Sequence, residues 1–246
     1  MLLKCCLMAI IVLIAALTQS TSGFGFGIVF MAIMPFFFPY RMCIILSMSS
    51  VLALQINTII KLHRYIQWKL VIVPGIFSII FGIIGTNYMT KTNPKLLSFI
   101  MGFFLWILAF YMIFLASKIK LKKSTFTEAA AGSLGGFTGS VFAVGGPPMA
   151  AYYNSVIDSP NHYQGTIQTY FLINVLNILT NNFIHGNIHL NMIPFIILGI
   201  ICSTVGTQIG LRISDHISMT TVRKLAYTVM LLAGTYDIIK GIIHLI

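Results

Sequence analysis

One pattern occurs twice in the chain: a glycine-rich break interrupts an apolar stretch. The break covers residues 19–27 in the first half and residues 140–148 in the second, about 121 positions later. Other segments that match at this offset are 47–49 with 168–170 and 85–86 with 206–207. Repeated halves with broken helices in corresponding positions are a strong sequence indication of a transporter binding site. Because the first break has this partner, we expect the signal-peptide-like N-terminus to belong to the fold.

The composition excludes a water-soluble domain. Of the 246 residues, 58% are hydrophobic and 8% are charged, and the mean hydropathy is +0.95. A soluble domain carries about 25% charged residues, so this chain cannot cover a surface that faces water. The net charge of +11 raises nucleic-acid binding as an alternative, but the basic residues lie in short loops between apolar runs. Since cytoplasmic loops of membrane proteins are basic, we expect a multi-pass plasma-membrane protein that binds no nucleic acid.

Six apolar segments are long enough to cross a bilayer, which takes about 20 residues. They are residues 43–60, 70–89, 96–116, 165–184, 192–211 and 222–243. Two other segments, 5–38 and 128–157, are too long for one crossing and too short for two. Small and polar residues interrupt each of them near its middle. We predict that each is a helical hairpin that leaves the membrane on the side it entered, with its non-helical tip buried in protein or lining a wet cavity.

The distribution of Lys and Arg residues favours the hairpins. If both segments return to their starting side, ten basic residues share the face of loops 61–69, 117–127 and 212–224, and five lie on the other face. If each segment crosses once, the split is eight against seven. The hairpins therefore make the ten-charge face cytoplasmic and both termini external. The predicted fold is an all-α integral membrane protein of two inverted repeats, 1–123 and 124–246, each a broken-helix hairpin plus three transmembrane helices.

The glycines at the two breaks predict an anion site. Gly25 and Gly27 in the first break, and Gly145 and Gly146 in the second, let a ligand approach the backbone closely. The helix that resumes after each break begins with free N–H groups and the positive end of its dipole. Tight helix packing is the alternative role for a glycine pair, but two matched breaks favour the site.

Polar side chains lie on the segments that we expect to face the breaks. Gln19 and Ser20 belong to the first break, and Gln168, Asn174 and Asn177 lie on one crossing of the second half. Asn174 and Asn177 share a helical face, and Gln168 lies about 120° to one side of Asn174. The corresponding crossing of the first half carries Ser47, Ser49, Ser50, Gln55 and Asn57. We predict that substrate is bound by the side chains of Gln19, Ser20, Gln168, Asn174 and Asn177. For each of them, interhelical hydrogen bonding is the alternative role.

Charged and catalytic groups are scarce. No acidic residue lies in the middle of a predicted crossing, and we interpret Asp237 and Lys240, three positions apart, as a structural pair rather than a proton relay. The four cysteines have no metal-ligand spacing, and no enzyme motif is present. Of the six histidines, His185 and His189 are four positions apart, but Gly186 and Asn187 between them indicate a turn, so we interpret both as interfacial. The sequence therefore predicts a protein that is not an enzyme and that uses no cofactor or metal.

The chain resembles the sulfite exporter TauE/SafE family of membrane permeases. The resemblance rests on the glycine-rich stretches 23–27 and 135–148, and on the basic-then-apolar run 61–85 with its partner 187–206. It covers nearly the whole chain. It implies a secondary transporter that moves sulfite, organosulfonates or related sulfur-containing anions, commonly outward. The residues alone indicate a small-anion transporter with two inverted halves but do not identify sulfur.

Two alternative functions stay open at this point. In an anion channel the breaks would form a static filter, whereas a membrane scaffold would not transport at all. The expected partners are a small-molecule anion and the lipid bilayer. The sequence leaves open whether the protein is a monomer or a homo-oligomer.

Overall fold

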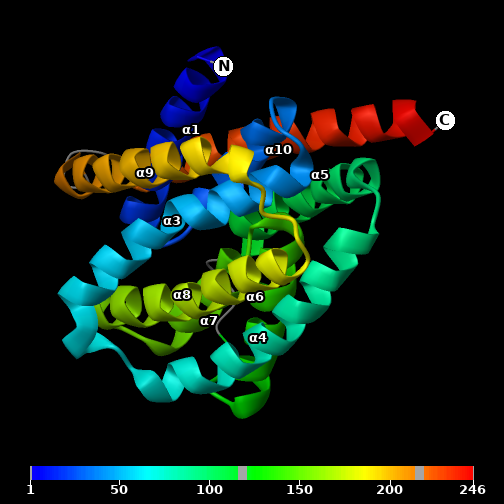
Figure 1. The fold of residues 1–246 in the computed structure, drawn as a ribbon. Helices are drawn as coiled ribbons and strands as arrows, with labels where there is room; N and C mark the ends of the chain where they lie inside the picture. Colours follow the sequence, from blue (N-terminus) through cyan, green and yellow to red (C-terminus); the bar gives the residue numbers. More distant parts are fainter. Residues whose placement is uncertain (1, 116–120, 214–218, 246) are drawn as a thin grey trace.

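The computed structural model describes residues 2–115, 121–213 and 219–245, and every regular element in these ranges is a helix (Figure 1). The longer helices are α1 (Leu2–Ser22), α3 (Tyr40–Leu62), α4 (Trp68–Lys91), α5 (Pro94–Phe110), α6 (Thr125–Phe142), α8 (Pro160–Ile184), α9 (Ile193–Ile213) and α10 (Met219–Leu245). The shorter elements are α2 (Phe26–Ile33), α7 (Gly146–Val156), the single turns η1 (Met34–Phe36), η2 (His63–Tyr65) and η4 (Leu190–Met192), and the π-helical η3 (Tyr111–Leu115). The predicted all-α membrane fold is confirmed.

Five helices in the described ranges are long and apolar enough to cross a membrane. They are Leu3–Ser20, Tyr40–Tyr65, Trp68–Lys91, Pro94–Leu115 and Leu190–Gly210. Four of them coincide with predicted crossings, whereas the first is α1, where the sequence predicts one arm of a hairpin. The predicted crossing 165–184 lies within α8 and the predicted crossing 222–243 within α10.

Sidedness and the inverted relation of the halves stay predictions. The basic loops 117–127 and 212–224 lie partly outside the described residues. The two helix breaks, in contrast, are described in full at the backbone level. They lie where the glycines predict them, between α1 and α2 and between α6 and α7.

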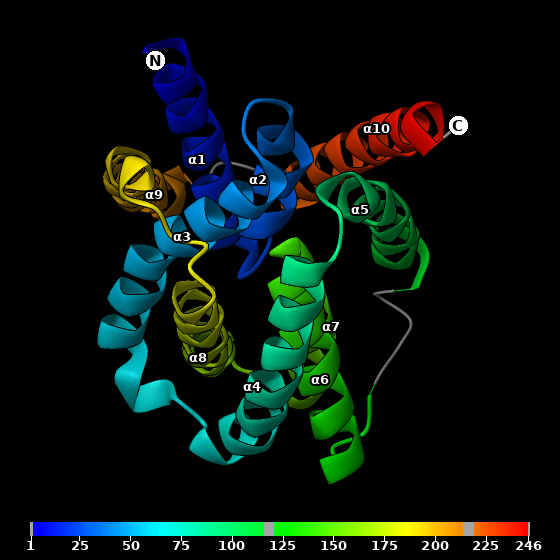
Figure 2. The ribbon, with the colours of Figure 1, turned by 45° about the vertical axis from the view of Figure 1, so that its right-hand side comes forward.

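Helices from the two halves pack against each other through small residues. α6 lies along α4, where Gly132 and Gly136 contact the backbone of Pro74 and Ser78 (Figure 2). α1 lies along α9, where a methyl group added at Gly206 would meet the side chain of Ala16. Residues without bulky side chains let helix backbones approach closely in a membrane, where no hydrophobic effect drives helices together.

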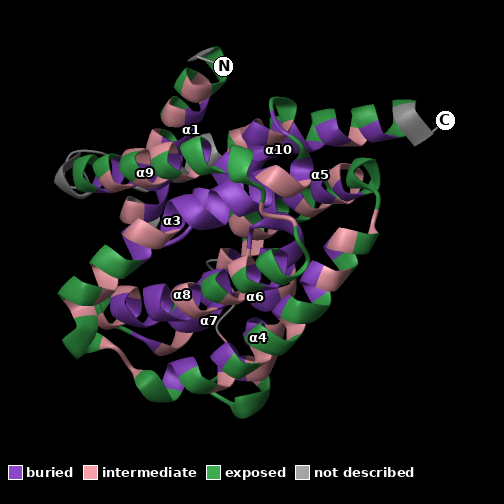
Figure 3. Ribbon diagram, viewed as in Figure 1, coloured by how far each residue is buried: buried purple, intermediate pink, exposed green. Residues whose placement is uncertain are grey.

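The centre of the protein is formed by α3 and α8, which pack against each other. Figure 3 shows the buried residues concentrated there, while exposed residues lie on the outer helices. On α4, the side chains of Ile72, Ile76, Ile80 and Ile84 recur every fourth residue and are about half exposed. An apolar stripe of this kind suits contact with lipid tails, and it leaves α3 and α8 to surround the two breaks.

Candidate functional site

The first break separates α1 from α2 by three residues. The N–H of Gly23 donates to the carbonyl of Gln19 at 2.8 Å, which closes α1. Gly23 and Gly25 then adopt φ angles of 82° and 115°. Residues with a side chain rarely take these values, so the chain can turn here only because both positions are glycine.

The second break lies between α6 and α7 and is formed by an alanine with a positive φ followed by two prolines, rather than by two glycines with positive φ. Ala143 ends α6 with a φ of 56°, the only positive φ of a non-glycine residue among those described. Its N–H donates to the carbonyl of Gly139 at 2.9 Å. Pro147 and Pro148 follow in the first turn of α7, where a missing N–H removes no helical hydrogen bond. The prolines therefore restart the helix without cost to its backbone pairing.

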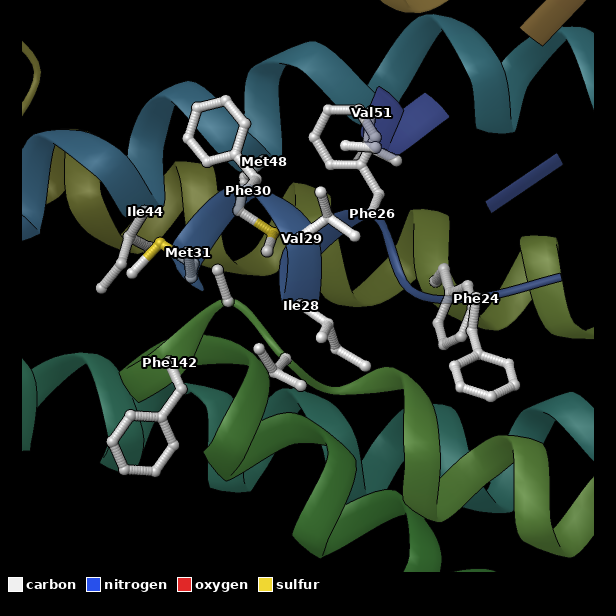
Figure 4. Packing of buried hydrophobic residues seen from close by; sticks show 14 of the residues in the cluster. Phe24, Phe26, Ile28, Val29, Phe30, Met31, Ile44, Met48, Val51 and Phe142 are labelled. Carbon is white, nitrogen blue, oxygen red and sulfur yellow. The ribbon is translucent and has the colours of Figure 1, made fainter. Parts of the chain in front are cut away.

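The two breaks meet inside the protein. A methyl group added at Gly27 would overlap the carbonyl oxygen of Ala143, and one added at Gly146 would lie 3.1 Å from the Cβ of Phe24. Figure 4 shows α2 between α3 and the segment that joins α6 to α7, with Ile28 directed toward that segment. Segments from the two halves of the chain thus form one contact region.

A cavity of about 50 Å³ lies at this contact. Six of the nine predicted site residues line it: Gln19, Gly25, Gly27, Gly145, Gly146 and Asn174. A single water needs roughly 10–15 Å³ on this measure, so the space suits an occupant of a few non-hydrogen atoms. Within the described part of the chain, no residue lining it is charged.

Gln168 does not line the cavity but holds the first break in place. Its Nε2 donates to the carbonyl of Gly23 at 3.0 Å, and its Oε1 accepts from Gln19 at 3.4 Å. The Oε1 of Gln19 in turn accepts the N–H of Phe26 at 3.2 Å, in the first turn of α2. The paired amides therefore fix the conformation of the residues that begin α2.

Ser20 and Asn177 lie elsewhere. Ser20 faces α9, where a methyl group added at Gly210 would overlap its hydroxyl oxygen. Asn177 donates to the carbonyl of Ile79 on α4 at 3.2 Å. Neither lines the cavity, because α9 and α4 cover these sides of α1 and α8.

Two polar residues on α3 complete the cavity wall. Ser47 and Gln55 line it, and both are almost fully buried. They were visible in the sequence as polar residues in an apolar crossing, but spacing alone did not distinguish them from Ser50, whose hydroxyl donates to the carbonyl of Leu46 at 2.6 Å. A hydroxyl bonded within its own helix is not available to a ligand.

The electrostatics of the cavity come from backbone groups. α2 and α7 both begin at its wall, at Phe26 and Gly146. Within the described residues, the N–H groups of Gly27 and Ile28 have no backbone acceptor. Free N–H groups and the positive ends of two helix dipoles favour an anion at this point.

A second cavity, of about 170 Å³, lies between η1, α5 and α10. Asp237, Lys240 and Lys95 line it, and Asp237 is buried. The Nζ of Lys240 lies 5.7 Å from the centre of the Tyr236 ring. Among the described residues, no group of three or more His, Cys, Asp or Glu side chains is placed to hold a metal ion.

Comparison with known proteins identifies the family. The family model described as sulfite exporter TauE/SafE matches residues 8–236, which include both breaks and every residue lining the first cavity. No curated protein and no solved structure matches the chain. Because the match extends over almost the full length, the chain belongs to the sulfite exporter TauE/SafE family, a family of membrane transporters for sulfur anions.

Proposed function

We propose that the protein exports a small sulfur oxyanion, either sulfite or an organosulfonate, across the plasma membrane. The observation that carries this proposal is the meeting of two helix N-termini, one from each half, at a single uncharged cavity. Anion sites of this type need no charged side chain. The family supports the sulfur chemistry, and the structure supports the place of binding.

Binding without a charged side chain suits a transporter. A buried Arg or Lys would hold an anion strongly and slow its release. Each helix N-terminus carries about half a positive charge, and two of them stabilise one negative charge more weakly than an ammonium group in direct contact. An inside-negative potential favours outward movement of an anion by about 2.3 kcal/mol per charge per 100 mV, so export needs no further coupling ion.

Packing between the halves supports two inverted repeats. α1 of the first half packs on α9 of the second, and α6 of the second half packs on α4 of the first. In the same way, α3 packs on α9 and α8 packs on α4. The segments 1–123 and 124–246 thus exchange equivalent contacts, as halves that rock about a shared site do.

Flux measurements in proteoliposomes test the function. We expect saturable efflux of sulfite or a sulfonate that responds to a clamped potential with the sign of an anion, and counterflow when the same anion is on both sides. Carboxylates of similar size serve as the comparison. Transport of a cation, or a conductance that does not saturate, would contradict the proposal.

A further inference from the structure

The cavity wall contains a carbonyl oxygen without a partner. Asn174 is 4% exposed, and its Nδ2 donates to the carbonyl of Gly135 at 3.1 Å. A carbonyl can only accept, so this bond fixes which end of the amide faces Gly135. The other end, Oδ1, is buried and has no hydrogen-bond partner among the described residues.

Two more unpartnered oxygens belong to the opposite wall. Gln55 on α3 is 2% exposed and its Oε1 has no partner, and the hydroxyl of Ser47 is buried without one. Both residues line the same cavity as Asn174. Native proteins pair nearly all buried polar atoms, so a cluster of unpaired ones indicates a ligand that pairs them.

The chemistry of these oxygens restricts the ligand. An oxyanion without hydrogen offers only acceptors, and its oxygens would repel the Oδ1 of Asn174, whose orientation the bond to Gly135 fixes. Gln55 makes no hydrogen bond that fixes its amide, so it can turn its N–H2 end toward the anion. An anion with a hydrogen of its own satisfies both kinds of group. Its charged oxygens accept from the N–H groups of Gly27 and Ile28 and from the Ser47 hydroxyl, and its hydrogen is donated to Asn174.

We infer that the transported species is a monoanion that carries its own O–H or N–H hydrogen, which Asn174 accepts. This inference rests on the proposed function. Among sulfur oxyanions it selects hydrogen sulfite over the sulfite dianion, and sulfonates with a hydroxyl or amino group on or near the sulfur over simple alkyl sulfonates. A sodium ion would also suit three oxygens, but two helix N-termini disfavour a cation here.

Sulfamate and methanesulfonate provide a matched pair of probes. They have the same charge and nearly the same shape, and they differ in an amino group against a methyl group. Titration calorimetry on the purified protein in sodium-free buffer should give a sulfamate affinity about tenfold higher or more, because a site built for a hydrogen bond rejects the analogue that lacks it. For sulfite itself, affinity should fall as the pH rises and hydrogen sulfite loses its proton.

Substitutions link this preference to one atom. Asn174→Leu should bring the sulfamate-to-methanesulfonate ratio close to one. Asn182→Leu is the matched control on the same helix, because the Nδ2 of Asn182 already donates to Ile178 at 2.9 Å and its Oδ1 accepts from Asn187 at 3.0 Å. The control should keep the preference of the wild-type protein.

The outcomes separate the inference from the proposed function. Equal affinity for the two probes in the wild-type protein overturns the inference while leaving anion transport intact. Binding that requires sodium overturns it in favour of a cation between the three oxygens. If sulfite alone binds, affinity that rises with pH overturns it and affinity that falls supports it. If no sulfur anion binds at any pH, the proposed function itself is wrong.

Discussion

The α-carbon of Gly27 lies directly against the carbonyl oxygen of Ala143, so that no side chain fits between them. The two residues are 116 positions apart and come from different halves of the chain. Their contact brings the start of α2 to the end of α6. Both residues line the first cavity.

Gly27→Ala tests this contact directly. The added methyl group would overlap the Ala143 carbonyl, and overpacking of this kind costs about 1–3 kcal/mol. We expect at least a tenfold loss of transport, measured as sulfite efflux from proteoliposomes. Gly75→Ala is the control, because its methyl group would lie 3.5 Å from the Ile173 side chain, an ordinary contact. Normal transport by the Gly27 variant would show that the breaks need not touch.

Larger substitutions at both breaks should stop transport without preventing insertion. Gly25 has a φ of 115°, and a methyl group added at Gly146 would lie 3.1 Å from the Cβ of Phe24, so Leu fits neither position. We expect Gly25→Leu and Gly146→Leu to reach the membrane at normal levels and to show no flux. Membrane fractionation provides the control for insertion. Wild-type flux in either variant would remove that break from the site.

Polar substitutions should divide into two groups. Asn174→Ala removes a cavity side chain and Gln168→Ala releases the first break, and each should weaken sulfite binding by about 1–2 kcal/mol, or roughly 5- to 30-fold. Ser20→Ala and Asn177→Ala should leave affinity within about twofold, because neither residue lines the cavity. Calorimetric titration checks both groups. A loss of affinity in the second group as large as in the first would mean that substrate binds elsewhere.

Cysteine labelling can show which side of the membrane the basic loops face. Ser124 caps the N-terminus of α6 and follows Lys122 and Lys123, and we predict that it faces the cytoplasm. A cysteine there, in a cysteine-free background, should react with a membrane-impermeant reagent only after the cells are opened. Ser218, in the other basic loop, lies outside the described residues but serves as a second label. Labelling of either residue in intact cells would reverse the predicted orientation.

The sequence predicted the breaks well because their signal is local. Glycine permits positive φ angles and proline restricts φ wherever they occur; Gly23 and Gly25 separate α1 from α2, and Pro147 lies in the first turn of α7, as expected. The assignment of polar residues depended on which helix covers which face. Asn177 shares a helical face with Asn174, yet α4 packs over Asn177, and its amide donates a hydrogen bond to the carbonyl of Ile79 on α4. Such a contact between distant segments cannot be derived from spacing within one helix.

The hydrogen bond between the amides of Gln19 and Gln168 has a consequence for the turnover rate of transport. It joins residues 149 positions apart, one from each half, at 3.4 Å. If the halves rock to open the cavity to one side and then the other, this bond must part and re-form in every cycle. A long, neutral hydrogen bond is worth on the order of 1 kcal/mol, so breaking it adds little to the barrier of the transport cycle and slows turnover little. An ion pair in its place would cost more to break, so the cavity would open more slowly and the substrate would stay inside it for longer.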